Sequence, residues 1–280
     1  MKRTTRAIAL STVDYSDTSQ IVSFLTRDVG LLDGIAKGAH RTRNPFEGPF
    51  DLAVHYEIGF IARRSSGLAI ITEAEVLDGF RGLRGSWSRH VAASQTIEFL
   101  RGVSVAGEPT PELFDLAVVI LDGLSTAAES LLAWILLGFE ARALRLLGFL
   151  ADIDSCVMCG RPRPGAGAAF FSPIGGGLVC RGCRGGAAAA SGRIATLSGA
   201  AVAALRELCE TDASEYGVGR PDFSAGGAAR TRRTSVEGEN PAPALPSVAV
   251  LRQLHGCVSR SVAALLDRPL RMLRYRAAWL

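Results

Sequence analysis

Leu52-Ala53-Val54-His55-Tyr56-Glu57-Ile58-Gly59-Phe60 is the segment with the clearest structural pattern in this chain. Large apolar side chains occupy every second position from Leu52 to Phe60. Because side chains alternate between the two faces of a β-strand, this pattern predicts a strand with one buried face. His55, Glu57 and Gly59 are then expected on the opposite, solvated face.

Four further strands are predicted around this one. The candidate segments alternate in polarity or are rich in β-branched and aromatic residues, and turn signals separate them. They are Thr5–Val13, Ser19–Thr26, Leu31–Lys37 and Leu68–Val76. Five short strands favour a small closed barrel, and the five-stranded OB-fold is the common solution at this size. We therefore expect an OB-fold over residues 1–80.

The pattern changes to a helical period from about Trp87. Thr110 and Pro111 are typical of a helix start, and the apolar residues after them recur at helical spacing. Residues 127–147, closed by Gly148, are apolar nearly all round, which is typical of a helix at the centre of a bundle. A helical domain is expected to follow the barrel.

Two later helices and a break between them complete the helical part. Ser198 and Ser247 can each act as an N-cap, the second for a helix that runs to about Leu266. Residues 217–246 are rich in Gly, Pro, Ala, Ser and Arg, which is typical of a flexible insertion. The predicted fold class is α+β. Its expected parts after the barrel are a helical domain over 81–152 and 191–216, a cysteine module over 153–190, the insertion 217–246, and a C-terminal helix within 247–280.

Four cysteines carry the strongest chemical signal in the sequence. Cys156 and Cys159 form one Cys-x-x-Cys pair, Cys180 and Cys183 form a second, and twenty residues separate the pairs. This spacing is typical of a four-cysteine zinc site. Four thiolates complete a tetrahedral zinc ion, so we expect one structural Zn²⁺ with no open position for catalysis. Paired disulfides or a redox dithiol are the alternatives.

Other residues that can bind metals have simpler explanations. Cys209 and Cys257 stand singly in helical patterns and are expected in the core. His55-Tyr56-Glu57 with a later Cys-x-x-Cys loosely matches the signature of zinc nucleobase deaminases. The context argues against that match, because His55 and Glu57 lie on an alternating strand and Ser155 replaces the proline of the signature.

Cationic residues gather after the third predicted strand. They are Lys37, His40, Arg41 and Arg43 on a Gly-containing loop, with Arg63 and Arg64 in the turn before the fifth strand. On an OB-fold, such a rim can follow the phosphates of a nucleic-acid strand. A solvated charged loop is the simpler alternative. Near the C-terminus, Arg268, Arg271, Arg274 and Arg276 are expected on a solvated helix face, with a second DNA-facing surface as the alternative.

Composition and charge bound the class of protein. With 48% hydrophobic and 21% charged residues, the chain has the balance of a folded globular protein. A formal net charge of +4 is too small to indicate a nucleic-acid partner by itself. Any attraction to nucleic acid must therefore come from a local basic patch. The N-terminus lacks the apolar stretch of a signal peptide, and the longest apolar run, Leu131–Phe139, is too short to cross a membrane. We expect a cytoplasmic protein.

Three segments, together with the order of the parts, carry a family resemblance. They are residues 15–26 (YSDTSQIVSFLT), 30–39 (GLLDGIAKGA) and 170–180 (FFSPIGGGLVC). Over nearly its whole length the chain resembles the RecO family of bacterial recombination mediators. The resemblance implies an N-terminal OB-fold, a zinc module inserted in a helical domain, and a non-enzymatic role. It also implies binding of single- and double-stranded DNA, strand annealing, and cooperation with RecR to load RecA onto strands coated by single-stranded-DNA-binding protein.

The chain departs from the family pattern at two places, and two other classes of function remain as alternatives. His40 replaces the first arginine of the family's usual Lys-Gly-Ala-Arg-Arg, which weakens the charge of the loop at neutral pH. The insertion 217–246 also departs from the family. A zinc-ribbon enzyme acting on nucleic acid should show clustered carboxylates for metal ions or a phosphate loop, and the sequence shows neither. A purely protein-binding scaffold should have no affinity for single strands at low salt.

Overall fold

The computed structural model describes residues 1–62, 67–151, 153–163, 165, 167–186, 194–210 and 245–276. The chain divides into two compact units, the first over Met1–Thr126 and the second beginning at Ala127. The predicted insertion 217–246 lies outside the described residues, apart from its last two positions. None of the helices in the described part of the chain combines the length and the apolar character needed to span a membrane.

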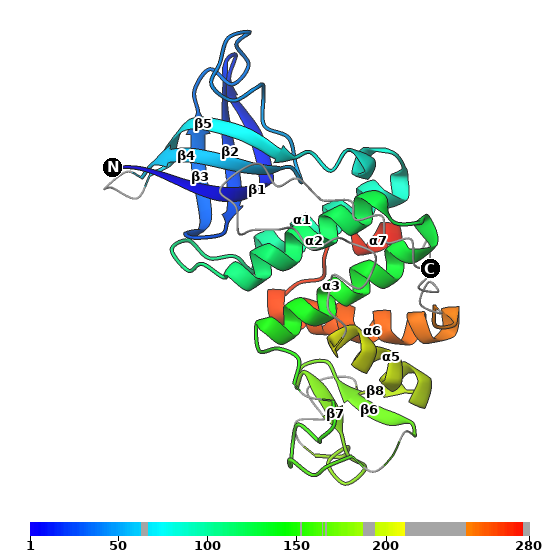
Figure 1. Ribbon diagram of the computed structural model, residues 1–280. Helices are drawn as coiled ribbons and strands as arrows, with labels where there is room; N and C mark the ends of the chain where they lie inside the picture. The colour runs from blue at the N-terminus through cyan, green and yellow to red at the C-terminus, as the bar shows by residue number, and fades with distance from the viewer. Residues whose placement is uncertain are drawn as a thin grey trace. The chain divides into compact units, whose positions relative to one another are not determined.

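Five strands of the first unit close into a barrel (Figure 1). They are β1 (Lys2–Ser16), β2 (Ser19–Thr26), β3 (Gly30–Ala36), β4 (His55–Ile61) and β5 (Ala69–Asp78). Neighbouring strands follow the order β1-β2-β3-β5-β4, and β1 pairs back to β4. Only the β3–β5 pair among these is parallel. This barrel confirms the predicted OB-fold, and its closure pairs the edges that an open sheet would expose.

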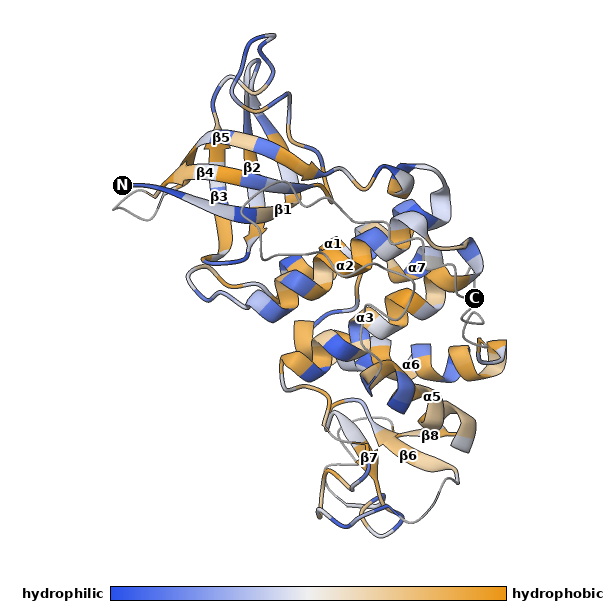
Figure 2. Cartoon of the chain, viewed as in Figure 1, coloured by the Kyte–Doolittle hydropathy of each residue, from blue (hydrophilic) through white to orange (hydrophobic). Residues whose placement is uncertain are grey.

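Aromatic side chains fill the interior of the barrel, and apolar residues mark its strands in Figure 2. The ring of Phe50 lies 5.4 Å from that of Phe24 and 5.1 Å from that of Tyr56, centroid to centroid. Tyr56, Ile58 and Phe60 are all buried, as the alternation predicted. Leu52 departs from the pattern, because it precedes β4 and is exposed.

The prediction of a solvated second face on β4 was wrong. The side chain of His55 is only 2% exposed, and Gly59 is buried as well. The ring of His55 packs edge-on against Phe114 of helix α2 (Pro111–Thr126), with centroids 5.7 Å apart. Strand alternation predicts which face of β4 is apolar. It does not predict that a helix more than fifty residues later buries the other face.

The turn before β3 holds this helical cover against the barrel. The guanidinium of Arg27 donates to both carboxylate oxygens of Asp115 in α2, at 2.9 and 3.0 Å. Gly30 has a positive φ of 74°, and a Cβ there would lie 2.4 Å from the carbonyl oxygen of Val105. Only glycine permits this approach, which lets Leu31 N–H donate to the same carbonyl at 3.0 Å. Val105 lies just after the end of helix α1 (Trp87–Val103).

Burial of His55 predicts a loss of stability in mild acid. Burial, aided by the nearby charge of Arg6, lowers the pKa of His55 from 6.5 to about 4. Below pH 6.5 the unfolded chain therefore takes up a proton that the folded chain refuses, so the free energy of unfolding falls until about pH 4. The loss from this group is about 2 kcal/mol between pH 7 and pH 5.

Urea unfolding at both pH values measures this loss. His55→Leu, similar in volume, should lose about 2 kcal/mol less than the wild type between pH 7 and pH 5. His90, which is exposed, supplies the control, and His90→Ala should keep the wild-type dependence. Equal losses in wild type and His55→Leu would contradict the assignment.

Helices and a small sheet make up the second unit. The helices are α3 (Leu132–Leu146), α5 (Gly199–Glu210), α6 (Val248–Leu266) and α7 (Leu273–Arg276). The short 3-10 turn η2 (Glu129–Leu131) precedes α3, just as η1 (Arg81–Arg84) precedes α1 in the first unit. The small sheet has the order β7-β6-β8, with β6 at Ala169–Ser172, β7 at Gly177–Val179 and β8 at Ala195–Leu197.

Helix α3 is the central helix that the sequence predicted, because every residue from Leu132 to Leu144 is buried. The two predicted caps are also confirmed. The hydroxyl of Ser198 accepts from Ala201 N–H at 3.2 Å, and that of Ser247 accepts from Val250 N–H at 3.4 Å.

The basic residues near the C-terminus are arranged differently from the prediction. Arg268 and Arg271 are exposed but precede α7, so they do not share a helix face with Arg274. The guanidinium of Arg274 lies 4.7 Å from the ring centroid of Tyr275.

Candidate metal centre and nucleic-acid interface

The first Cys-x-x-Cys pair forms a tight turn in the second unit. Cys156 C=O accepts from Gly160 N–H at 2.8 Å, and Cys156 N–H donates to Arg161 C=O at 2.9 Å. Gly160 has a positive φ of 68°, which glycine adopts without strain. Val157 N–H donates to Leu178 C=O at 2.9 Å, so this turn is attached to the segment that leads to the second pair.

The second pair forms a similar turn at the end of β7. Cys180 C=O accepts from the N–H groups of Cys183 and Arg184, both at 3.1 Å. The antiparallel pairing of β6 and β7 brings the chain back through Gly175, Gly176 and Gly177. Both turns therefore present their sulfur atoms toward the same point.

The four sulfur atoms lie close enough to bind one ion. The Sγ atoms of Cys156, Cys159, Cys180 and Cys183 are all within 4.8 Å of one another, and those of Cys159 and Cys180 are 3.8 Å apart. Tetrahedral zinc with bonds of about 2.3 Å requires sulfur separations of about 3.8 Å. The donor set and its spacing thus fit a tetrahedral, thiolate-loving cation. Cys209 and Cys257 do not join the group, and burial raises the pKa of each of these two thiols.

Charge at the cluster also favours a cation. Burial raises the pKa of the Cys156 thiol, but hydrogen bonds from backbone N–H groups, that of Cys180 first among them, lower it more, so its pKa falls to about 6. That N–H lies 3.3 Å from the Cys156 sulfur. Hydrogen bonds with Cys180 and Cys159 keep the proton on Cys183 and raise its pKa to about 12. Without a cation, the four sulfurs must share protons to limit their repulsion.

The predicted basic loop follows β3 in the first unit and is exposed at each cationic position. Lys37, His40, Arg41 and Arg43 all face solvent. Within the described residues, no carboxylate forms an ion pair with Lys37, Arg41 or Arg43. Arg63 and Arg64, the other two predicted contacts, lie outside the described residues.

Asn44 orders the loop from within. Its side-chain N–H groups donate to Arg41 C=O at 2.7 Å and Ala39 C=O at 3.3 Å. Its side-chain oxygen accepts from Phe46 N–H at 2.8 Å. Phe46 is buried in the barrel core, so the loop is tied to the barrel just after its cationic residues.

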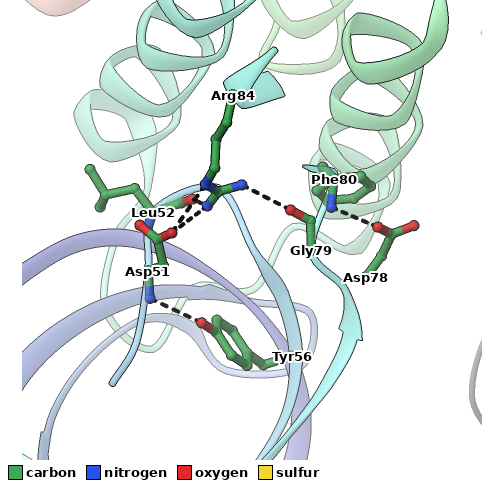
Figure 3. Close-up of polar contacts among 7 residues, drawn as sticks. All are labelled: Asp51, Leu52, Tyr56, Asp78, Gly79, Phe80 and Arg84. Atoms are coloured by element: carbon green, nitrogen blue, oxygen red, sulfur yellow. Dashed lines mark hydrogen bonds and ion pairs between the residues drawn. The ribbon is translucent and has the colours of Figure 1, made fainter. Parts of the chain in front are cut away.

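The end of the same loop is clamped by residues distant in sequence, which Figure 3 shows in close-up. Tyr56 OH accepts from Asp51 N–H at 3.0 Å. The guanidinium of Arg84 donates to one carboxylate oxygen of Asp51 at 2.5 and 3.2 Å, and to Gly79 C=O at 3.0 Å. Three of these contacts reach Asp51 and hold the segment between the basic residues and β4, and the fourth fixes Arg84 itself.

His40 joins the loop to the hairpin of β1 and β2. Its Nε2 lies 2.9 Å from a carboxylate oxygen of Asp14, and this hydrogen bond, followed by one from Gln20, lowers the pKa of Asp14. His40 N–H donates to Thr18 C=O at 3.1 Å. Sequence reasoning did not single out Tyr15, which follows Asp14 in β1, is 65% exposed and carries an aromatic ring on which a base can stack. The sequence signal that could have found Tyr15 is its position in a polar stretch next to a turn, where an aromatic ring is expected to be exposed.

The barrel with its basic loop and the segment with the four cysteines both match models of one protein family. The family model described as "Recombination protein O N terminal" matches residues 1–80, and "Recombination protein O C terminal" matches residues 84–217. The "DNA repair protein RecO" of Rhodopirellula baltica is 35% identical over 270 residues, which cover 95% of this chain and 96% of that protein. The chain belongs to the RecO family.

Two other RecO relatives are similar over shorter stretches. The "DNA repair protein RecO" of Rubrobacter xylanophilus is 36% identical over 182 residues, or 64% of this chain and 70% of that protein. That of Anaeromyxobacter dehalogenans is 32% identical over 203 residues, or 72% of this chain and 77% of that protein. The basic loop lies within the match to the N-terminal RecO model, and the four cysteines lie within the C-terminal one.

Proposed function

We propose that this chain is a recombination mediator in DNA repair. It binds single- and double-stranded DNA, anneals complementary strands and, with RecR, helps to load RecA onto strands coated by single-stranded-DNA-binding protein. Its place of work is the cytoplasm, at the nucleoid. The observation that carries this proposal is the ordered basic loop on an OB barrel in a chain of the RecO family.

The loop suits binding of a phosphate backbone for two reasons. Its cations at Lys37, Arg41 and Arg43 have no ion-pair partners among the described residues, so no internal salt bridge must break when a strand arrives. The contacts of Asn44 and Arg84 order the loop in advance, which lowers the entropic cost of binding. His40 belongs to the interface as the link to the hairpin, and Tyr15 can stack with a base. Arg63 and Arg64, which lie outside the described residues, remain proposed contacts from the sequence.

Cys156, Cys159, Cys180 and Cys183 would hold one Zn²⁺ as a structural cross-link. With four thiolate ligands, such an ion stabilises the module and leaves no position for a reacting water. We therefore propose binding and strand pairing without chemical turnover. The chemistry of the chain then lies in bringing strands together, which requires neutralised phosphates and no bond cleavage.

Strand annealing by the purified protein is the direct test. Two complementary labelled strands should pair faster with the protein than without it, in the absence of ATP, as followed by energy transfer between dyes. Non-complementary strands are the control. An acceleration that requires ATP, or an ATPase or nuclease activity abolished by a point mutation in this chain, would contradict the proposal.

The same assay addresses the proposed partners. Strands coated with single-stranded-DNA-binding protein should still anneal in the presence of this chain, and addition of RecR should promote RecA filament formation on them. If coating blocks all annealing and RecR changes nothing, DNA binding would stand alone and the mediator role would be withdrawn.

A further inference from the structure

A cavity in the cysteine module has the properties of a second ligand site. It has a volume of about 450 Å³ and is partly open to solvent. Typical small-ligand sites measure roughly 300–1,000 Å³, so this cavity is large enough to hold one unit of a longer molecule. Its floor is apolar, formed in part by Phe170, Leu178 and Val179 of the small sheet.

The rim of this cavity is basic. Arg161 and Arg163 follow the first Cys-x-x-Cys turn, and Arg181 lies within the second. None of the described residues that line the cavity is Asp or Glu, but two of the cluster cysteines, Cys156 and Cys180, also line it. The nearest carboxylate along the chain, that of Asp154, forms an ion pair with Arg206. The arginine side of the cavity, away from the two cysteines in its lining, therefore favours an anionic ligand.

A planar surface lies beside the rim. The guanidinium of Arg184, an exposed residue, lies over the ring of Phe170, 4.3 Å from its centroid. Because Arg184 is exposed, its guanidinium is accessible on the side away from the ring, and nucleic-acid bases stack on arginine planes. Asp and Glu side chains gain from arginine charge, but they have no aromatic ring to stack on this guanidinium. The combination favours a nucleotide unit over an acidic peptide.

The arginines of the rim do not hydrogen-bond to the sulfur cluster within the described residues. A zinc ion with four thiolates would carry about two negative charges, which nearby cations could offset. Within the described part of the chain, however, the polar contact to the Cys156 sulfur from another turn is the N–H of Cys180, and no arginine of the rim hydrogen-bonds to sulfur. Arg163 instead donates to Gly167 C=O. Arg161 and Arg181 are exposed and available to an external anion.

We propose that this cavity binds single-stranded nucleic acid, with Arg161 and Arg181 on successive phosphates and a base stacked on Arg184. The proposal rests on the proposed function, since it adds a second contact to the same strand-binding activity. It gives the cysteine module a role in binding beyond its structural one.

The test is a salt series of single-strand affinity, measured by fluorescence anisotropy on the full chain. Arg161→Gln/Arg181→Gln removes two phosphate contacts and should lower the slope of log affinity against log salt by about 1.4. That corresponds to roughly 25-fold weaker binding at 0.1 M salt. Arg101→Gln/Arg252→Gln is the matched control, because both residues are exposed, lie outside the cavity and give the same charge change.

Arg184→Lys tests the stacking plane separately. It keeps the charge and loses the planar group, so affinity should fall about fivefold or more with an unchanged salt slope. Metal content, measured for each variant, establishes that the module is intact.

Three outcomes decide the matter. Slopes that agree between the cavity variant and its control would overturn the inference, while wild-type DNA binding would leave the proposed function standing. Loss of affinity for a short Asp/Glu-rich peptide, without a change in DNA slope, would assign the cavity to a protein partner and also overturn it. No DNA binding by the wild type would instead contradict the proposed function.

Discussion

Replacing Cys159 by serine is expected to unfold the cysteine module and make the protein insoluble before DNA binding is affected. Ligation of a structural zinc contributes on the order of 10–16 kcal/mol of apparent folding free energy in small modules. The strands of the small sheet next to the cysteine turns, β6, β7 and β8, span only four, three and three residues, too short to form a stable sheet alone. Loss of one ligand therefore removes much of what holds the two turns together.

Elemental analysis and limited proteolysis measure this effect. The wild type should contain one zinc per chain, and Cys159→Ser far less, with new cleavage near residues 153–186. Cys209→Ser is the control, because Cys209 stands outside the cluster and should leave the zinc content unchanged. Wild type purified without chelator and free of zinc would contradict the assignment of the metal, and a soluble Cys159→Ser protein with intact proteolytic resistance would contradict its structural role.

Removing Lys37, Arg41 and Arg43 from the basic loop is expected to weaken single-strand binding about 100-fold at 0.1 M salt. Each phosphate contact releases counterions and contributes about 0.7 to the slope of log affinity against log salt on single strands. Lys37→Ala/Arg41→Ala/Arg43→Ala should therefore lower this slope by about 2. Base preference should hardly change, because phosphate contacts position a strand without reading its sequence.

Anisotropy across a salt series tests this result. Arg81→Ala/Arg101→Ala/Arg252→Ala carries the same change in net charge at exposed positions outside the loop, and it should reduce the slope much less. Unfolding curves check that both variants keep the stability of the wild type. A solvated loop without function predicts equal slopes for the two triple variants, and that result would move the DNA site away from β3.

The candidate metal centre was accessible from sequence because its information is local. A Cys-x-x-Cys turn fixes two sulfur atoms within four residues, and Gly160 supplies the positive φ that the first turn needs. The two turns meet when the chain between them folds back on itself, and the hairpin of β6 and β7 folds it back. The spacing could indicate the ligand set, whereas the N–H contacts to the Cys156 sulfur depend on how the turns meet.

The proposed nucleic-acid interface was only partly accessible in this way. The charges of Lys37, Arg41 and Arg43 are visible in the sequence, but a mobile loop and an ordered one look the same there. Order comes from the contact of Arg84 with Asp51, thirty-three residues apart, and from Phe46 in the barrel core. The link from the loop to the β1–β2 hairpin likewise joins residues far apart, because His40 and Asp14 are twenty-six positions apart.

The sequence by itself determined the barrel strands, the helix starts at Ser198 and Ser247, and the four cysteines, because periodicity, capping and ligand spacing act over a few residues. Tertiary structure decided that His55 is buried, that the loop is clamped, and that Arg161 and Arg181 share one cavity. These features depend on segments tens of residues apart, whose approach is fixed only when the whole core packs and no local pattern records it.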